Sequence, residues 1–367
     1  MTRVLVVAPS WIGDAVLAQP LFMRLHERID KLQLDVLAPA WTLPVFKRMP
    51  EVSGTLANPF EHGDLKLFAR RKFAHQIATR HYERAFVLPN SFKSALLPWF
   101  AGIRAITGYR GEKRGWILSD CRDLDAIALP LMAERFVWLA QPRTTPLERP
   151  IPYPRLKINT EARAKLLATL DLNTSKPIVA FCPGAEFGPA KRWPVRHFAT
   201  LAQMLAQQGK QVWLFGSTKD TEITRAIMRE CGDVSGDVCR DLAGKTGLDD
   251  AIDLLSLASH VVTNDSGLMH IACAVGVPVS ALYGSSSPGF TPPLSDSART
   301  LWLKDELKLD CSPCFKRECP LGHFKCMNLM TPEHVMATMA PKSNRGDKTP
   351  RTACAPTTAG SPLPGAM

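Results

Sequence analysis

The feature that most constrains the fold of this chain is the alternation of short β-branched runs with helical stretches, which occurs in both halves. The helical stretches between the runs include His197–Gln208 and Leu248–Ala258. Such alternation predicts α/β folding, with parallel sheets covered by helices on both faces. The predicted strands are Arg3–Ala8, Gln33–Ala38, Arg84–Pro89 and Arg104–Tyr109 in the first half, and Ile178–Cys182, Gln211–Gly216, His260–Asn264 and Val279–Gly284 in the second.

A proline-rich segment separates the two series. Residues 142–157 contain five prolines and cannot form a regular element, so we predict a linker there. The sequence therefore predicts two Rossmann-like domains, residues 1–155 and 156–340, which face each other across a cleft and bind ligands at the carboxyl ends of their strands. Residues 341–367 are rich in Pro, Thr, Ser, Gly and Ala, and we predict a disordered tail.

Composition narrows the class of protein. Hydrophobic residues make up 46% of the 367 residues and charged residues 22%, as in soluble proteins. No run approaches the roughly 18 apolar residues of a membrane span, and ten cysteines in a long chain favour thiols in the cytoplasm over a secreted disulfide framework. The net charge of +11 suits an anionic partner, although an ordinary basic enzyme explains it equally well.

The first candidate site is the loop after the first predicted strand, Ser10–Asp14. Gly13 permits a tight turn or a close backbone approach, and Asp14 lies where a helix should begin. One interpretation is a helix N-cap. The other is a general base at the mouth of a cleft, with Ser10 and Gly13 beside the substrate. The local pattern does not separate the two.

The second candidate is the segment Cys182–Pro194, in which Gly184 opens a loop and Lys191 and Arg192 precede a helix that Pro194 could start. Two cations beside backbone N–H groups at a helix start predict a phosphate site. A solvated Lys-Arg pair is the alternative. The spacing does not fit a Walker A loop, which needs Gly-Lys-Ser/Thr.

The third candidate is Asn264–His270. Asp265 or Ser266 caps a predicted helix, the N–H groups of Ser266 to Leu268, which include that of Gly267, would face an anion, and His270 lies one turn further on the same side. The alternative is a capped helix with a packed histidine. With the second candidate, this loop predicts a diphosphate ligand.

The fourth candidate follows another predicted strand, at Ser217–Glu222. Asp220 or Glu222 could hold ribose hydroxyls, and the sequence does not distinguish them; an N-cap at Asp220 is the alternative.

A fifth motif is rich in cysteine, with His323 in its last interval. Its spacing allows a structural metal site, although only one Cys-x2-Cys pair is present, and free thiols are the alternative. No metal is otherwise expected. The four cysteines are Cys311, Cys314, Cys319 and Cys326.

Basic clusters occur in the first half. We expect them to be solvated surface, unless they hold an acidic acceptor or an anionic membrane. Their members are Lys66, Arg70, Arg71, Lys72, Arg110, Lys113 and Arg114.

Three of these motifs together resemble those of the bacterial ADP-heptose:lipopolysaccharide heptosyltransferases, glycosyltransferase family 9. They are Val6–Val16, Pro183–Pro194 and Asn264–His270, in the same order as in that family. The resemblance covers residues 1 to about 340, and Gly188–Pro194 and Cys319–His323 are similar to type II members.

The resemblance implies a GT-B fold and inverting transfer of L-glycero-D-manno-heptose from ADP-heptose to the first heptose of the Kdo2-lipid A core. The acceptor would lie at the inner face of the cytoplasmic membrane, so the enzyme would be cytoplasmic, with peripheral membrane contact, no nucleic-acid partner and no required cofactor. By motif position Asp14 is the base and Lys191 contacts the donor diphosphate. The donor loop would comprise Asp265, Ser266, Gly267 and His270, and Thr246 would lie near the adenine.

The sequence leaves three rival interpretations. A type I or III heptosyltransferase would share the donor and differ in the acceptor. A nucleotide-sugar epimerase or hydrolase on the same fold would need no acceptor. A basic or zinc-binding nucleic-acid protein is the third rival, but no basic stripe interleaved with aromatic residues supports it.

Overall fold

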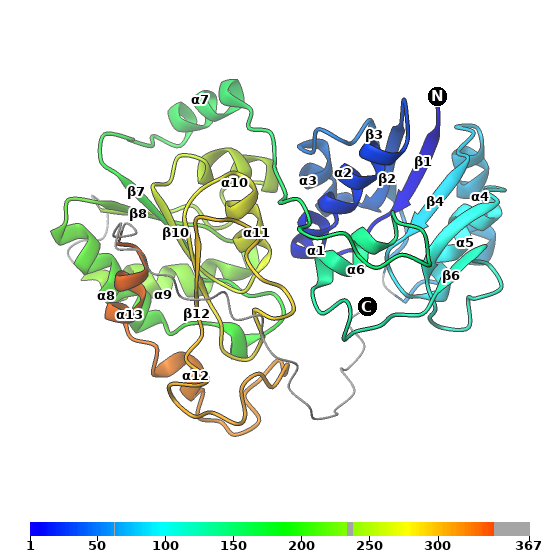
Figure 1. The fold of residues 1–367 in the computed structure, drawn as a ribbon. Helices are drawn as coiled ribbons and strands as arrows, with labels where there is room; N and C mark the ends of the chain where they lie inside the picture. Colours follow the sequence, from blue (N-terminus) through cyan, green and yellow to red (C-terminus); the bar gives the residue numbers. More distant parts are fainter. Residues whose placement is uncertain (62, 233–237, 341–367) are drawn as a thin grey trace. The chain divides into compact units, whose positions relative to one another are not determined.

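The computed structural model describes residues 1–61, 63–232 and 238–340. The chain divides into two compact units, one from Met1 to Pro152 and one that begins at Tyr153. Each contains one parallel six-stranded sheet with helices beside its strands (Figure 1). The predicted α/β architecture with two Rossmann-like sheets is therefore confirmed. The predicted tail, residues 341–367, lies outside the described residues.

The sheet of the first unit has the strand order β3-β2-β1-β4-β5-β6. Val4, Leu5 and Val6 of the central strand β1 are fully buried, because both neighbouring strands and the helices cover them. The strands are β1 (Arg3–Val7), β2 (Gln33–Pro39), β3 (Gly54–Asn58), β4 (Arg84–Val87), β5 (Ala105–Tyr109) and β6 (Asp120–Arg122). The helices are α1 (Ile12–Leu17), α2 (Gln19–Arg28), η1 (Ala40–Thr42), α3 (Leu43–Lys47), α4 (Leu67–Ala78), α5 (Phe92–Phe100) and α6 (Met132–Trp138).

The sheet of the second unit has the order β12-β11-β10-β7-β8-β9. Its strands are β7 (Ile178–Cys182), β8 (Gln211–Leu214), β9 (Cys239–Asp241), β10 (His260–Asn264), β11 (Val279–Leu282) and β12 (Ala298–Leu301). Its helices are α7 (Thr160–Thr169), η2 (Pro189–Lys191), α8 (Val195–Gln207), η3 (Thr218–Asp220), α9 (Thr221–Cys231), α10 (Leu248–Leu255), α11 (Gly267–Ala274), α12 (Lys325–Asn328) and α13 (Pro332–Thr338).

Both sheets follow the Rossmann strand order, counted from the first strand of each unit. In such a sheet the order reverses between the first and fourth strands, and ligands bind in the crevice at that point. The crevices therefore lie after β1 and β4 in the first unit, and after β7 and β10 in the second. Three of the four candidate loops follow one of these strands.

All eight strands predicted from sequence are present, and four further strands were missed: β3, β6, β9 and β12. These four are the edge strands of the two sheets. A central parallel strand is buried on both faces and reads as an apolar run, whereas an edge strand is partly exposed and mixes polar with apolar residues. The missed strands show this mixed burial.

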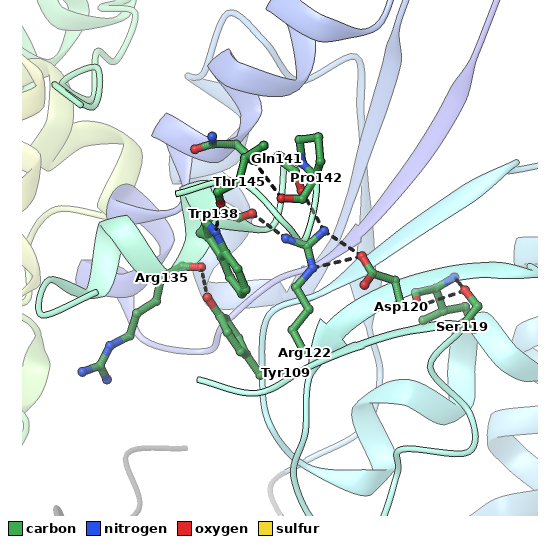
Figure 2. A network of polar contacts seen from close by, with 10 residues as sticks. Tyr109, Ser119, Asp120, Arg122, Arg135, Trp138, Gln141, Pro142 and Thr145 are labelled. Carbon is green, nitrogen blue, oxygen red and sulfur yellow. Dashed lines mark hydrogen bonds and ion pairs between the residues drawn. The ribbon is translucent and has the colours of Figure 1, made fainter. Parts of the chain in front are cut away.

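The prediction that the proline-rich segment forms no regular element is confirmed, because residues 142–157 contain no helix or strand. Its first part is fastened to the first unit (Figure 2). The buried Arg122 guanidinium pairs with Asp120 at 2.7 Å and donates to the carbonyls of Trp138 at 2.6 Å and Gln141 at 2.9 Å. The Trp138 indole in turn donates to the Thr145 carbonyl at 3.0 Å. Edge strand β6 thus holds the chain as it leaves α6.

Within the described ranges, the helices are all too short or too polar to cross a bilayer.

Candidate active site

The second unit brings the loops after β7 and β10 together through a buried ion pair. Lys191, at the end of η2, places its Nζ 2.6 Å from Oδ2 of Asp265, which follows β10. The Asp265 side chain is 5% exposed and that of Lys191 18% exposed. Low exposure strengthens the attraction and makes loss of either partner costly. Two residues that the sequence assigned to separate motifs therefore form one site.

Asn264 joins the same two loops and was not predicted as a functional residue. Its buried side-chain amide donates to the Pro183 carbonyl at 2.7 Å and accepts from the Trp193 backbone N–H at 3.0 Å. A carboxamide both donates and accepts, so it can bridge two backbone groups in this way. The available signal was position, because Asn264 is the polar residue that ends this strand and opens the third candidate loop.

Helix α11 starts beside this ion pair. Its N-cap residue is Ser266, but no side chain caps the helix, and Asp265 is engaged with Lys191 instead. The predicted side-chain cap is therefore wrong. The first-turn N–H groups, which begin at Gly267, receive no cap bond from the Ser266 side chain and suit an anion.

His270 lies one turn into α11 and is 4% exposed. Burial lowers its pKa to about 4; the Lys191 ammonium acts in the same direction, and Asp265 opposes it. The imidazole is therefore neutral at pH 7 and adds no positive charge to the site. The lysine and the helix N-terminus supply the positive potential.

This shift predicts a pH-dependent stability. An unfolded histidine binds its proton near pH 6.5, whereas folded His270 binds it only near pH 4. Between these values the unfolded chain holds more protons, so the free energy of unfolding falls as the pH is lowered, by at most about 3 kcal/mol for this group. Urea unfolding at pH 7, 5.5 and 4.5 measures the fall, which should be smaller in His270→Asn. Burial also lowers the pKa of His260 to about 4, so part of the fall should persist in the variant. A fall in the variant equal to that of the wild type would contradict a contribution from His270.

The loop after β8 lies against the loop after β7. Asp220 accepts hydrogen bonds from the Ser217 N–H at 2.9 Å and hydroxyl at 2.8 Å. A Cβ on Gly184 would clash with the Asp220 carboxylate, which would have to leave its bonds to Ser217. Asp220 occupies the N-cap position of α9, as the capping alternative predicted, but its side chain makes no cap bond to that helix and closes a capping box with Ser217 at the start of η3. Glu222, in the first turn of α9, is exposed.

Two further predicted residues border this region. Thr246 follows β9 on a loop that the Gly244 N–H fastens to the Gly216 carbonyl at 3.1 Å, and its hydroxyl lies 3.4 Å from the Leu242 carbonyl. Arg192 is half-buried, and its Nε has no hydrogen-bond partner within the described chain. An unpartnered guanidinium N–H beside Lys191 suits an anionic ligand.

In the first unit, Asp14 lies in the first turn of α1 and is half-buried. The N-cap position belongs to Trp11, so the N-cap alternative for Asp14 is wrong. Gly13 is helical and makes no tight turn. The exposed Ser10 offers its carbonyl to the Trp41 indole N–H at 2.9 Å, which ties this loop to the end of β2; sequence reasoning missed Trp41.

The cysteine-rich segment converges on a small cavity of about 10 Å³, which its four cysteines and His323 line. All four are free thiols, and burial and the neighbouring thiols raise the pKa of Cys326 to about 11. Within the described ranges, no three His, Cys, Asp or Glu side chains are arranged to hold a metal ion. The structural metal considered from the spacing stays a prediction.

The expectation that the basic clusters are solvated is wrong for two members. Arg70 is 3% exposed and Arg114 fully buried. Arg114 has no carboxylate partner among its hydrogen bonds; it donates to the carbonyls of Tyr109, Pro89 and Ser91, and burial lowers its pKa to about 10. It therefore braces the loops after β4 and β5.

Comparisons with known proteins show to which family the chain belongs. Residues 70–325 match the model of glycosyltransferase family 9 (heptosyltransferase). Lipopolysaccharide heptosyltransferase 2 of Escherichia coli is 46% identical over 82% of this chain and 88% of that protein. Lipopolysaccharide heptosyltransferase 1 of Pseudomonas aeruginosa is 25% identical over 86% of this chain and 87% of that protein.

A solved heptosyltransferase structure is also similar to this chain. The Escherichia coli ADP-heptose lps heptosyltransferase II matches with a TM-score of 0.82 and 41% identity, over 92% of this chain and 97% of that one. The rival interpretations as an epimerase or as a nucleic-acid-binding protein are therefore disfavoured. The chain belongs to glycosyltransferase family 9, the heptosyltransferases.

Proposed function

We propose that the chain transfers L-glycero-D-manno-heptose from ADP-heptose to the first heptose of the Kdo2-lipid A core, with inversion at the anomeric carbon. The supporting observation is the buried Lys191–Asp265 pair beside the uncapped start of α11, a site suited to a diphosphate. The greater identity to a type 2 than to a type 1 enzyme favours the heptosylated acceptor.

The two units have different tasks in this proposal. The second holds the donor, with its diphosphate at Lys191, Arg192 and the first-turn N–H groups of α11. The first holds the acceptor, whose hydroxyl gives its proton to Asp14. The oxygen attacks the anomeric carbon, and the bond from that carbon to the diphosphate oxygen breaks.

The departing ADP keeps the bonding electron pair, so negative charge grows on its diphosphate. The Lys191 ammonium and the α11 amides are fixed before the reaction and need little reorganisation to stabilise that charge. Because Asp265 already pairs with Lys191, we assign it to holding the ammonium in place. These groups supply the positive charge that a divalent cation provides in other transferases, and we propose that no cofactor is required.

The two acids of the β8 loop should behave differently. Asp220 already accepts two hydrogen bonds from Ser217, so we assign it to loop structure and the exposed Glu222 to the ribose hydroxyls. Glu222→Gln should raise the KM for ADP-heptose about tenfold and leave the melting temperature unchanged, since a hydrogen bond to a charged group contributes about 1.5–3 kcal/mol. Asp220→Asn should lower the melting temperature. A normal donor KM in Glu222→Gln would contradict the assignment.

The deciding experiment is an acceptor-dependence assay with purified protein and ADP-heptose. We expect transfer to Kdo2-lipid A that carries the first heptose, and none to the acceptor without it. Transfer to the heptose-free acceptor would show a type I activity. Consumption of ADP-heptose without any acceptor would favour an epimerase or hydrolase.

A lipid-anchored acceptor implies where the enzyme works. We propose a cytoplasmic protein that meets the inner membrane peripherally. Its partners would be ADP-heptose and the lipid A-core acceptor, without nucleic acid.

A further inference from the structure

Three aromatic side chains form a cluster at the surface of the first unit. The Trp116 ring lies 5.2 Å from that of Trp99 and 6.3 Å from that of Phe92, between centroids. Trp116 is 65% exposed and Trp99 42% exposed. Tryptophan is usually largely buried, so two exposed indoles in contact need an explanation. We call Phe92, Trp99 and Trp116 the aromatic patch.

The exposure of Trp116 is built into the fold. The preceding Arg114 is fully buried and fastens its loop to the start of α5, through the carbonyls of Pro89 and Ser91. The Arg114 Nη2 also donates to the Tyr109 carbonyl at 2.8 Å, at the end of β5. The loop therefore presents Trp116 on a rigid support.

Apolar exposure continues onto the neighbouring helix. Phe68, in the first turn of α4, is 92% exposed. Arg70, two residues on, reaches α5 and donates to the Lys93 carbonyl at 3.4 Å. The first turns of α4 and α5 thus lie side by side and expose apolar side chains.

Cationic residues lie on the same elements as this apolar surface. Arg71 and Lys72 are exposed on α4, Lys113 is exposed beside Arg114, and Lys93 is half-exposed on α5. Of two acids on the same segments, Asp64 pairs with Lys66 at 2.7 Å, and Glu112 accepts from the Phe92 N–H at 2.7 Å and keeps its charge. A surface that combines exposed aromatic residues with exposed cations is complementary to an anionic lipid surface.

We propose that the aromatic patch docks the first unit on an anionic bilayer, where the Trp99 and Trp116 indoles enter the headgroup region and Lys93 and Lys113 meet lipid phosphates. Indole rings favour that region because they combine an apolar ring with a polar N–H. The inference deepens the proposed function, since it says which surface would meet the membrane that holds the acceptor.

Vesicle sedimentation tests the proposal with the full chain. Wild-type protein should bind phosphatidylcholine vesicles that contain 30% phosphatidylglycerol, and binding should weaken in 0.5 M NaCl because salt screens charge. Trp99→Ser/Trp116→Ser should lower the partition coefficient at least tenfold. Leu329→Ser, which removes an apolar side chain 45% exposed on the second unit, is the matched control and should bind as wild type.

A kinetic comparison separates docking from catalysis. The double variant should keep the wild-type kcat and KM with a deacylated, soluble acceptor, and lose at least tenfold in rate with acceptor embedded in vesicles. Equal losses with both acceptors, with an unchanged melting temperature, would overturn the proposal.

Two other outcomes would overturn it as well. One is wild-type vesicle binding by the double variant. The other is a wild-type dimer that the two substitutions dissociate without any effect on vesicle binding, which would show that the patch joins two copies of the chain. Failure of the proposed function itself would look different, since vesicle binding would persist in a protein that transfers heptose to neither acceptor.

Discussion

Replacing Asp14 by Asn is expected to lower kcat for heptose transfer by about 10²- to 10⁴-fold, the usual contribution of a general base. The substitution keeps the size of the side chain and removes its ability to take a proton. Asp14 lies in the first turn of α1 in the first unit, whereas the groups assigned to the donor belong to the second. The affinity for ADP-heptose, measured by calorimetry, should therefore be nearly unchanged.

Asp123→Asn provides the matched control in the same unit. Asp123 is exposed and pairs with Arg110 at 2.6 Å, so its amide should leave turnover near the wild-type value. If Asp14→Asn retained turnover within a few fold of wild type, Asp14 would not be the sole base. If donor affinity fell together with kcat, Asp14 would act in binding.

Replacing Lys191 by Ala is expected to have the second large effect, a fall of about 10²- to 10³-fold in kcat/KM, similar to the removal of one group from a preorganised electrostatic site. The ammonium would no longer stabilise the leaving diphosphate. The substitution also leaves the carboxylate of Asp265, which is 5% exposed, without its cation, a change that costs about 3–5 kcal/mol. Steady-state kinetics and the melting temperature together measure both effects.

Two comparisons separate these contributions. Lys191→Met/Asp265→Asn removes both charges, so it should recover much of the lost stability without recovering activity. Lys219→Ala breaks a pair of the same length, 2.6 Å to Glu186, but this pair is exposed and should matter little for transfer. Recovery of activity in the double variant would show that Lys191 only neutralises Asp265.

The sequence predicted the central strands and the candidate loops for a local reason. A strand buried on both faces needs an uninterrupted apolar run, as in Ile178–Cys182, and the polar residues that follow such a run lie at the carboxyl edge of the sheet. The positions of Asp14, Lys191 and Asp265, each in a loop after such a run, therefore predicted that they lie at the crevices. The edge strand β12, which is partly exposed along its length, has no such run and was missed.

Local sequence patterns predicted the roles of individual residues less well than they predicted the strands and loops. Asp14 and Ser266 each stand where a helix starts, and both could be read as side-chain caps. In the structure Trp11 occupies the N-cap of α1, and Ser266 makes no cap bond in α11. Whether a residue caps a helix depends on the exact residue at which the helix begins, and sequence spacing does not determine that boundary to a single residue.

The sequence by itself determined the two parallel sheets, the linker between them and the loops that bear the polar residues, because each follows from composition and periodicity within a few residues. Only the tertiary structure decided what those residues do to one another. Lys191 meets Asp265 across 74 positions, and Asn264 bridges to Pro183 across 81. Arg114, which resembled a solvated cation, is buried among carbonyls. Such contacts form when the sheet brings distant strand ends to one edge, so their geometry, burial and electrostatics belong to the packed fold and not to any local run of residues.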